Sequence, residues 1–202
     1  APATAYGVFV GLKAAVKHRL GRTDLTGLKV AIQGVGNVGY LLARHLNNAG
    51  AELWVYDIRQ ENMDKAITEF GAKAATAEDI LFLPVDVIAP CALGAILNGH
   101  SIPKLHAQVV AGAANNQLAT PANDLDLLKR GILYAPDFVL NAGGIINVFY
   151  EHSNQNTDKI WSHIETISET LNEIFTRSDR DKRPTGEIAN ELAEERFSKK
   201  SK

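Results

Sequence analysis

Short apolar runs alternate with amphipathic stretches along most of the chain. The runs at 28–33 (LKVAIQ), 52–56 (ELWVY), 85–89, 108–111 and 132–135 have the length and composition of strands. Runs of this kind, bounded by glycine, proline or polar turn residues, are typical of strands buried on both faces of a parallel sheet. The pattern therefore predicts five strands.

Helices are predicted between these strands and at both ends of the sequence. Thr4 is expected to cap the first helix and Gly21 to end it, because threonine and glycine are favoured at these two positions. The predicted helices cover residues 5–20, 38–48, 61–70 and 125–130, the region from 144 onward, and about 185–198 after Pro184. In the region from 144 onward, one helical face carries Ile160, Ile164, Ile167 and Leu171.

Strands that alternate with helices indicate a parallel sheet with helices on both of its faces. We therefore expect an α/β fold of the Rossmann type, doubly wound and mostly parallel, with extra terminal helices. In this prediction residues 1–21 form an N-terminal helix, 28–150 the Rossmann core and 157–198 the C-terminal helices of one dinucleotide-binding domain. Ligands bind such sheets at the carboxyl ends of the strands, and the glycine- and asparagine-rich segments of this chain follow predicted strands.

The composition changes this picture little. Of the 202 residues, 46% are hydrophobic and 22% charged, and the formal net charge of −2 gives no basic surface for nucleic acid or an anionic membrane. No apolar run approaches the roughly 20 residues that cross a bilayer, and the first residues do not resemble a signal peptide. Cys91 is the single cysteine, so an internal disulfide is excluded, and the sequence shows no spacing typical of a metal site. A reducing cytoplasm is the expected location.

The segment after the first predicted strand carries the clearest local motif. Gly34-Val35-Gly36-Asn37-Val38-Gly39 matches G-x-G-x-x-G. In this motif the first glycine permits a tight turn, the second lets the backbone approach a pyrophosphate, and the third allows close packing of helix on strand. The following helix presents unpaired N–H groups to the phosphates. The motif predicts a dinucleotide site, and the alternative is a glycine turn that only packs a helix on the sheet.

An acidic residue at the end of the second predicted strand completes this fingerprint. Asp57 follows the glycine motif at the required distance of about 20 residues, and its carboxylate can accept hydrogen bonds from the adenosine ribose hydroxyls. Ile58 belongs to the same predicted site. A carboxylate would repel a 2′-phosphate, so NAD is favoured over NADP, while Arg59 is a feature that would favour NADP. The alternative role for Asp57 is that of a helix cap.

Four further segments resemble the glutamate/leucine/phenylalanine/valine dehydrogenase family, above all its leucine dehydrogenases. They are residues 4–8 (TAYGV), 89–95 (APCALGA), 111–118 (AGAANNQL) and 135–144 (APDFVLNAGG), and they follow the family's order across nearly the whole chain. The resemblance implies the C-terminal NAD-binding domain of such an enzyme. It also implies reversible, NAD-dependent oxidative deamination of an L-amino acid to its 2-oxo acid and ammonia.

The resemblance also assigns roles to individual residues. Besides the glycine motif, Asp57 and Ile58, the implied cofactor contacts are Thr4, Ala89, Pro90, Cys91, Ala113, Asn115 and Asn141. The implied substrate contacts are Asn141, Ile164 and Ile167, and the two isoleucines favour a branched aliphatic side chain.

Each of these assignments has an ordinary structural alternative. Asparagine offers a donor and an acceptor to a carboxamide or a ribose, but at strand ends it also forms Asx-turns. Thr4 is as well suited to a helix cap as to a nicotinamide contact. Ile164 and Ile167 are equally compatible with core packing. Cys91 is interpreted as a small residue beside the ring and not as a nucleophile, because nothing near it in sequence marks it as activated.

The chemistry of the family needs groups that this sequence does not supply. In the family, a low-pKa lysine acts as general base and a cation holds the substrate carboxylate, both within a glycine- and lysine-rich context of an N-terminal domain. No such context occurs here, and the chain opens without Met directly into helix-like sequence. We therefore expect no catalytic residue in this chain, an N-terminal catalytic domain that is absent from it, no turnover by the chain alone, and a homo-oligomer as the full-length form.

Other functions stay open on the sequence alone. The full-length enzyme could act on phenylalanine, valine or glutamate instead of a branched-chain amino acid. The chain could also be a free-standing module that senses NAD and acts through a partner, or a structural remnant that binds nothing. One position departs from the leucine dehydrogenases, where alanine is frequent in place of Gly39, and either residue is expected to pack there.

Overall fold

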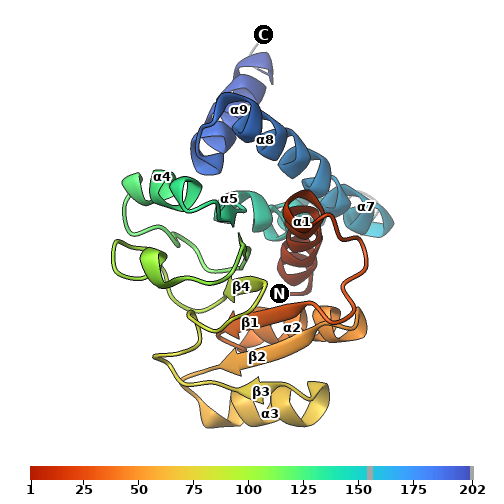
Figure 1. The fold of residues 1–202 in the computed structure, drawn as a ribbon. Helices are drawn as coiled ribbons and strands as arrows, with labels where there is room; N and C mark the ends of the chain where they lie inside the picture. Colours follow the sequence, from red (N-terminus) through yellow and green to blue (C-terminus); the bar gives the residue numbers. More distant parts are fainter. Residues whose placement is uncertain (154–156, 201–202) are drawn as a thin grey trace.

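The computed structural model describes residues 1–153 and 157–200, and in them one parallel sheet has the strand order β3-β2-β1-β4-β5-β6 (Figure 1). The strands are β1 (Lys29–Gln33), β2 (Glu52–Tyr56), β3 (Lys73–Ala74), β4 (Val87–Pro90), β5 (Val109–Val110) and β6 (Leu133–Tyr134). The order runs outward from β1 in one direction and from β4 in the other. This reversal is the topological switch point at which such sheets bind ligands. The predicted α/β fold of the Rossmann type is confirmed.

Helices cover the sheet and extend beyond it. They are α1 (Pro2–Leu20), α2 (Asn37–Asn48), α3 (Gln60–Phe70), α4 (Ala122–Lys129), α5 (Asp137–Leu140), α6 (Ala142–Ser153), α7 (Ile160–Glu165), α8 (Ile167–Asp181) and α9 (Thr185–Lys200), with short 3-10 turns at Ile102–Lys104 and Thr157–Lys159. In Figure 1, β3 and α3 form one end of the molecule, and α8 and α9 form the other.

The N-terminal helix lies at the centre of the core. α1 packs against α2, α6 and α8, and its side chains Val8, Leu12 and Val16 are fully buried. A helix with apolar residues on most of its sides is suited to such a position, while Lys13 and Lys17 mark its exposed side. Gly11 permits the close approach of α5, because a Cβ there would lie 2.7 Å from Cγ of Leu140. A second apolar cluster, which includes Ile88, Ile102, Val110 and Leu127, extends the core around β4 and β5.

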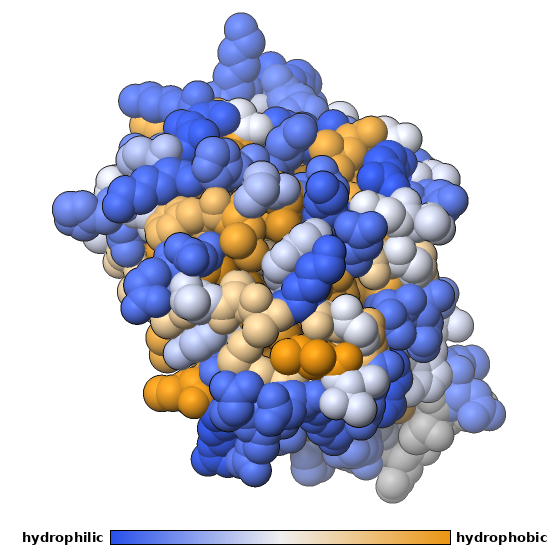
Figure 2. Space-filling view, turned by 60° about the horizontal axis from the view of Figure 1, so that its bottom comes forward, coloured by the Kyte–Doolittle hydropathy of each residue, from blue (hydrophilic) through white to orange (hydrophobic). Residues whose placement is uncertain are grey.

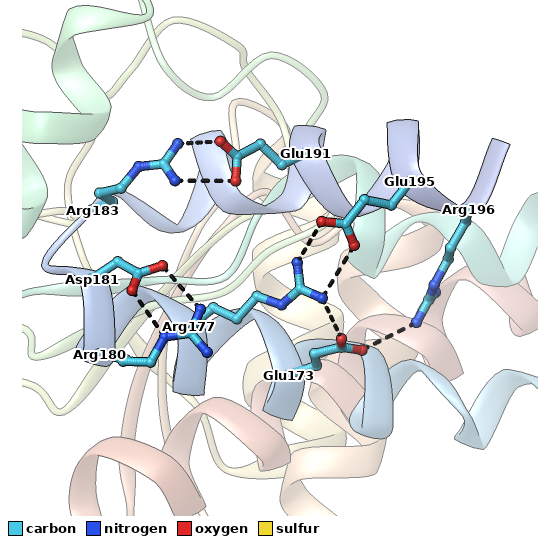
Figure 3. Close-up of polar contacts among 8 residues, drawn as sticks. All are labelled: Glu173, Arg177, Arg180, Asp181, Arg183, Glu191, Glu195 and Arg196. Carbon is cyan, nitrogen blue, oxygen red and sulfur yellow. Dashed lines mark hydrogen bonds and ion pairs between the residues drawn. The ribbon is translucent and has the colours of Figure 1, made fainter. Parts of the chain in front are cut away.

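Ion pairs connect α9 to α8 at the surface (Figure 3). Arg177 of α8 pairs with Glu173 at 2.8 Å and with Glu195 of α9 at 3.0 Å. Arg183, just before α9, binds the carboxylate of Glu191. Each exposed ion pair adds little stability. The position of α9 therefore depends mainly on its buried apolar face.

Several predicted element boundaries need correction. The prediction that Thr4 caps the first helix is wrong, because α1 begins at Pro2 with Ala1 as the N-cap and no side-chain cap. The end of this helix at Gly21 is confirmed by the left-handed conformation of that glycine, with φ 67°. β3 was not predicted, since its two residues are exposed and give no apolar run. The helix expected from 144 onward begins two residues earlier, at Ala142, and β4, β5 and β6 are shorter or shifted relative to the predicted runs.

Candidate functional site

The loop between β1 and α2 carries the glycine motif at the switch point. Gly34 adopts φ +97°, a conformation that favours glycine, and a Cβ there would lie 2.5 Å from Cβ of Ala92. Gly36 is the N-cap of α2, and a Cβ built on it meets no atom within 4 Å. The protein itself therefore does not require glycine at position 36. Close approach of a ligand to the backbone would require it.

The third glycine of the motif is required by the fold. A Cβ at Gly39 would lie 1.9 Å from the carbonyl oxygen of Gly34 and 3.3 Å from Cβ of Cys91. The expectation that alanine packs equally well at position 39 is therefore wrong for this backbone, because the whole loop would have to move. This contact also places the glycine motif directly beside the segment that follows β4.

The carboxylate of Asp57 holds the same loop. Its Oδ2 accepts the N–H of Val35 at 2.9 Å, and its Oδ1 accepts the N–H of Arg59 at 2.8 Å and Nδ2 of Asn62 at 3.2 Å. The N-cap of α3 is Arg59, so Asp57 is not the cap of this helix. A carboxylate has about four lone-pair sites, and three donors leave room for a ribose hydroxyl.

A cavity of about 570 Å³ opens beside the glycine loop. Residues of the loop, α2 and α3 line it, among them Val35, Gly36, Asn37, Arg59, Asn62 and Lys65. The lining contains two cationic side chains and no carboxylate, and the first N–H groups of α2 add partial positive charge, so the cavity favours an anion. Ile58, next to Asp57 in the sequence, is 89% exposed and free to contact a ligand.

The segments that follow β4 and β5 pack against each other at the same edge of the sheet. Ala89 and Pro90 end β4, and the carbonyl of Pro90 accepts the N–H of Ala114 at 2.8 Å. A Cβ at Gly112 would lie 2.2 Å from that same carbonyl oxygen. Glycine at position 112 therefore allows the loop after β5 to lie on the end of β4.

Asn141 joins this edge from the segment before α6. Its Nδ2 donates to the carbonyl of Ala113 at 3.0 Å and to Oδ1 of Asn115 at 3.1 Å. Its own Oδ1 is buried and has no hydrogen-bond partner among the described residues. A buried acceptor without a donor costs free energy, so Asn141 Oδ1 is suited to accept a hydrogen bond from a ligand. The structure thus brings Ala113, Asn115 and Asn141 together.

The thiol of Cys91 lies between the glycine loop and the loop after β5. Burial raises the pKa of this thiol to about 11, although a hydrogen bond with the backbone of Ala113 acts in the opposite direction. Since the thiolate is the reactive form of cysteine, a raised pKa makes Cys91 a poor nucleophile. This agrees with the expectation that Cys91 is not a nucleophile, and its place beside the cofactor stays a prediction.

Thr4 lies against the start of α6. A Cβ at Gly144 would lie 2.7 Å from Oγ1 of Thr4, and a Cβ at Gly143 would lie 2.4 Å from the carbonyl oxygen of Ala3. The first turn of α1 therefore packs on the segment just after Asn141. The structure brings Thr4 to the same edge as the other residues predicted to contact the cofactor.

The two isoleucines predicted to contact substrate occupy different places. Ile164 is 0% exposed and belongs to the main core. Ile167 is 4% exposed. It lines a cavity of about 300 Å³ together with Ala142 and Ile146 of α6. Core packing accounts fully for the burial of Ile164. Ile167 also borders this cavity, and another residue that lines it, Ala142, directly follows Asn141 in the sequence. The substrate role of both stays a prediction.

One surface feature was not found by sequence reasoning. Ile145, Val148 and Phe149 of α6 and Trp161 of α7 are 73%, 50%, 53% and 46% exposed. The spacing of three to four residues within 145–149 was the available signal, since it places these side chains on one helical face. Figure 2 shows a face of the molecule on which hydrophobic residues gather near the centre and hydrophilic residues surround them.

Two other kinds of feature are absent from the described part of the chain. Within residues 1–153 and 157–200, no group of three or more histidine, cysteine, aspartate or glutamate side chains is placed to hold a metal ion. Within the same residues, no helix has the length and hydropathy needed to cross a membrane.

Comparison with known proteins agrees with this geometry. The model of the Glutamate/Leucine/Phenylalanine/Valine dehydrogenase family matches residues 1–59 and 53–187. The chain belongs to this family. The leucine dehydrogenase of Geobacillus stearothermophilus is 48% identical over 196 residues, which are 97% of this chain and 53% of that protein. The L-tryptophan dehydrogenase of Nostoc punctiforme is 45% identical over 199 residues, 98% of this chain and 56% of that protein.

A solved structure of a family member has the same fold. The crystal structure of L-tryptophan dehydrogenase from Nostoc punctiforme superimposes with a TM-score of 0.95 at 44% identity, over 98% of this chain and 60% of that one. The chain thus spans about half the length of the family members that it matches. Over the matched part, the solved structure therefore shares the α/β fold of this chain.

Proposed function

We propose that this chain is the dinucleotide-binding domain, residues 1–202, of an NAD-dependent amino-acid dehydrogenase. The observation that carries the proposal is the convergence of four segments on one edge of the sheet. The glycine loop, the end of β4, the loop after β5 and the segment before α6 meet there. Membership of the dehydrogenase family supports the same function.

The residues at this edge fit the parts of a dinucleotide. The open space in front of Gly36 leaves room for a pyrophosphate on the N-terminus of α2. Asp57 is placed to accept hydrogen bonds from the adenosine ribose, with Ile58 beside it. At the other end, the unpartnered Oδ1 of Asn141 is suited to a donor of the nicotinamide half, for example its carboxamide N–H.

NAD is the cofactor that we propose. The carboxylate of Asp57 would repel a 2′-phosphate, and it lies at the end of β2, where the ribose of a bound dinucleotide is expected. Arg59 and Lys65 line the neighbouring cavity, and their positive charges would favour a 2′-phosphate and hence NADP. Because Asp57 already holds the loop through the N–H of Val35, it is fixed next to the ribose position. Both cations are exposed, so solvent weakens their attraction for a 2′-phosphate, and we infer that Asp57 decides the preference.

The bound dinucleotide would supply the hydride acceptor. The residues of this chain would bind it, orient the nicotinamide against the end of β4, and exclude water on that side through Ala89, Pro90 and Cys91. For the full-length protein we propose reversible oxidative deamination of a branched-chain L-amino acid to the 2-oxo acid and ammonia. Relatives named as leucine dehydrogenases at 45–48% identity support this substrate class, and relatives named as tryptophan and valine dehydrogenases are the alternatives.

The catalytic groups are proposed to come from elsewhere in the full-length protein. None of the described side chains at the sheet edge supplies a lysine poised as a general base, since Cys91, Asn115 and Asn141 are uncharged and Asp57 is at the adenosine end. The chain covers about half of its relatives, which supports a second part that carries the lysines. We therefore propose that the 202-residue chain binds NAD without turning over an amino acid.

Calorimetric titration with NAD and with NADP tests the proposal. The chain is expected to bind NAD saturably and NADP more weakly, and Asp57→Ala is expected to abolish NAD binding. Asp64→Ala is the matched control, because Asp64 is an exposed carboxylate on α3 whose one hydrogen bond among the described residues is with Gln60. Absence of NAD binding to the chain and to the full-length protein would refute the proposal. Oxidation of leucine, valine, phenylalanine, glutamate and tryptophan by the full-length protein then identifies the substrate.

A further inference from the structure

A separate cavity of about 510 Å³ lies at the β6 end of the sheet. Its walls come from the segment 116–121, from α4, from the start of α5 and from the first turns of α9. Leu118, Leu125 and Phe138 give it an apolar lining, and the last two are 42% and 45% exposed. Ligand sites of proteins are typically concave spaces of about 300–1,000 Å³ with apolar walls and a few polar groups, and this cavity has both properties.

The charged side chains that line this cavity have one sign. Asp124, Asp137 and Glu187 line it, and no lysine, arginine or histidine does. Asp124 is 8% exposed, and its two oxygens accept the N–H groups of Gly186 at 3.5 Å and Glu187 at 3.1 Å. Of these three carboxylates, Glu187 alone is paired with an arginine. The cavity therefore attracts a cation.

Tyr134 adds a buried hydroxyl to the walls of the cavity. Its side chain lines the cavity and is 3% exposed, and its hydroxyl oxygen accepts the N–H of Asp137 at 3.4 Å. The hydroxyl hydrogen has no acceptor among the described residues. Burial raises the pKa of this hydroxyl above the ordinary value of tyrosine, so the hydroxyl keeps its hydrogen at neutral pH. A buried donor without an acceptor is costly, and an acceptor atom on a ligand would remove this cost.

We propose that this cavity is a second small-molecule site, and that its ligand is an organic amine cation with an apolar body and an uncharged acceptor group. The ammonium group faces the carboxylates, the apolar body lies on Leu118, Leu125 and Phe138, and the acceptor receives the hydrogen of Tyr134. A free amino acid is expected to bind more weakly, because its carboxylate would lie near Asp124 and Asp137 and no cationic side chain lines the cavity.

The same site is connected to the nucleotide edge. Oδ2 of Asp137 accepts the N–H of Gln117 at 3.1 Å, and Asn116, which lines the cavity, follows Asn115 directly. Asn115 in turn bonds Asn141. A ligand that immobilises the segment 116–121 is therefore expected to reduce the mobility of the neighbouring loop, which is proposed to hold the nicotinamide half. This coupling rests on the proposed function, whereas the amine site itself does not.

The test uses three ligands that share the leucine side chain and differ in the charged groups that they carry. Leucinamide carries an ammonium and an amide carbonyl, leucine adds a carboxylate, and N-acetylleucinamide has no charge. Calorimetry with the 202-residue chain is expected to show saturable binding of leucinamide, with the other two weaker by at least about tenfold, which corresponds to about 1.4 kcal/mol. Equal binding of all three, or binding of none, would overturn the proposal.

A variant locates the binding. Asn190 is an exposed residue of α9 that lines the cavity, so Asn190→Lys places a cation at its rim. Leucinamide binding is expected to weaken at least about tenfold in this variant. It should stay unchanged in Asn172→Lys, a matched exposed position on α8 that does not line this cavity. Equal effects in the two variants would refute the location.

Two further measurements keep the outcomes distinct. If Asn190→Lys does not fold, as judged by circular dichroism, Leu125→Trp fills the cavity from its exposed wall and is expected to weaken leucinamide binding equally. NAD titrations with and without saturating leucinamide measure the coupling. Unchanged NAD affinity refutes the coupling alone, while complete absence of NAD binding refutes the proposed function and leaves the amine site standing.

Discussion

Two glycine-to-alanine substitutions in the motif distinguish a glycine that the fold requires from a glycine that a bound ligand would require. Gly39→Ala places a methyl group 1.9 Å from the carbonyl oxygen of Gly34, so atoms must move by about 1.5 Å to reach ordinary contact at 3.4 Å. Overpacking of this kind costs about 1–3 kcal/mol. Gly36→Ala places the same group in open space, and its effect on the free energy of unfolding is expected to stay within about 1 kcal/mol.

The expected effects on NAD binding are different. Gly36→Ala projects its methyl group into the space proposed for the pyrophosphate, so NAD affinity is expected to fall at least about tenfold, or about 1.4 kcal/mol. Gly39→Ala is expected to lose both stability and affinity, because the displaced loop carries the N–H groups that face the phosphates. Urea denaturation with linear extrapolation gives the stabilities, and calorimetry gives the affinities.

Each substitution has a result that would refute the reasoning. An unfolding free energy of Gly39→Ala equal to that of the original chain would mean that the loop yields without cost, so the close approach at position 39 does not select glycine. Unchanged NAD affinity of Gly36→Ala would mean that no phosphate approaches the backbone there. The dinucleotide would then have to bind at another part of the edge.

Three further predictions concern buried groups. Burial raises the pKa of Asp124 from 3.8 to about 6, so the folded protein binds this proton more tightly than the unfolded chain does. The free energy of unfolding is therefore expected to fall by about 2–3 kcal/mol as the pH rises through this window. Asp124→Asn should remove that fall in urea titrations between about pH 4 and pH 7. Leu171 of α8 is fully buried against Gly11, so Leu171→Ala is expected to cost about 2–5 kcal/mol, and a cost below about 1 kcal/mol in the same titrations would contradict its place in the core. With a pKa near 11, roughly one Cys91 thiol in 10,000 is ionised at pH 7. The reaction of this thiol with a chromogenic disulfide should therefore be slow in the folded chain and fast in urea. A rapid reaction without urea would show an activated thiol.

The sequence was sufficient for the elements that build the nucleotide edge. The strand β2 was predicted with its observed bounds, and β1 and α2 to within one residue, because an apolar run and a glycine motif define them locally. β3 was missed, since its pairing with Trp54 and Val55 of β2 depends on backbone bonds of two exposed residues. A strand that buries no side chains leaves no hydrophobic signal.

The side-chain geometry of the site depends on contacts between distant segments. Asn141 was predicted as a site residue, but its bonds with Ala113 and Asn115 bridge 28 and 26 positions along the chain. Thr4 was expected to be a cap, yet the helix begins two residues before it and Thr4 faces Gly144 instead. The cavity proposed to bind an amine also has no local signal in the sequence, since Asp124, Asp137 and Glu187 are brought together only by the fold.

The hydrogen bonds of Asp57 decide how its substitution must be interpreted. Asp57→Ala removes the acceptor proposed for the ribose, and it also removes the acceptor for the N–H groups of Val35 and Arg59. Loss of NAD affinity with unchanged stability would therefore mark a direct contact with the ribose, because the loop then keeps its place without the carboxylate. Loss of both would mean that Asp57 acts mainly by holding the loop. In that case Asn62→Ala, which removes a donor to Asp57 and leaves both backbone bonds intact, should retain most of the affinity.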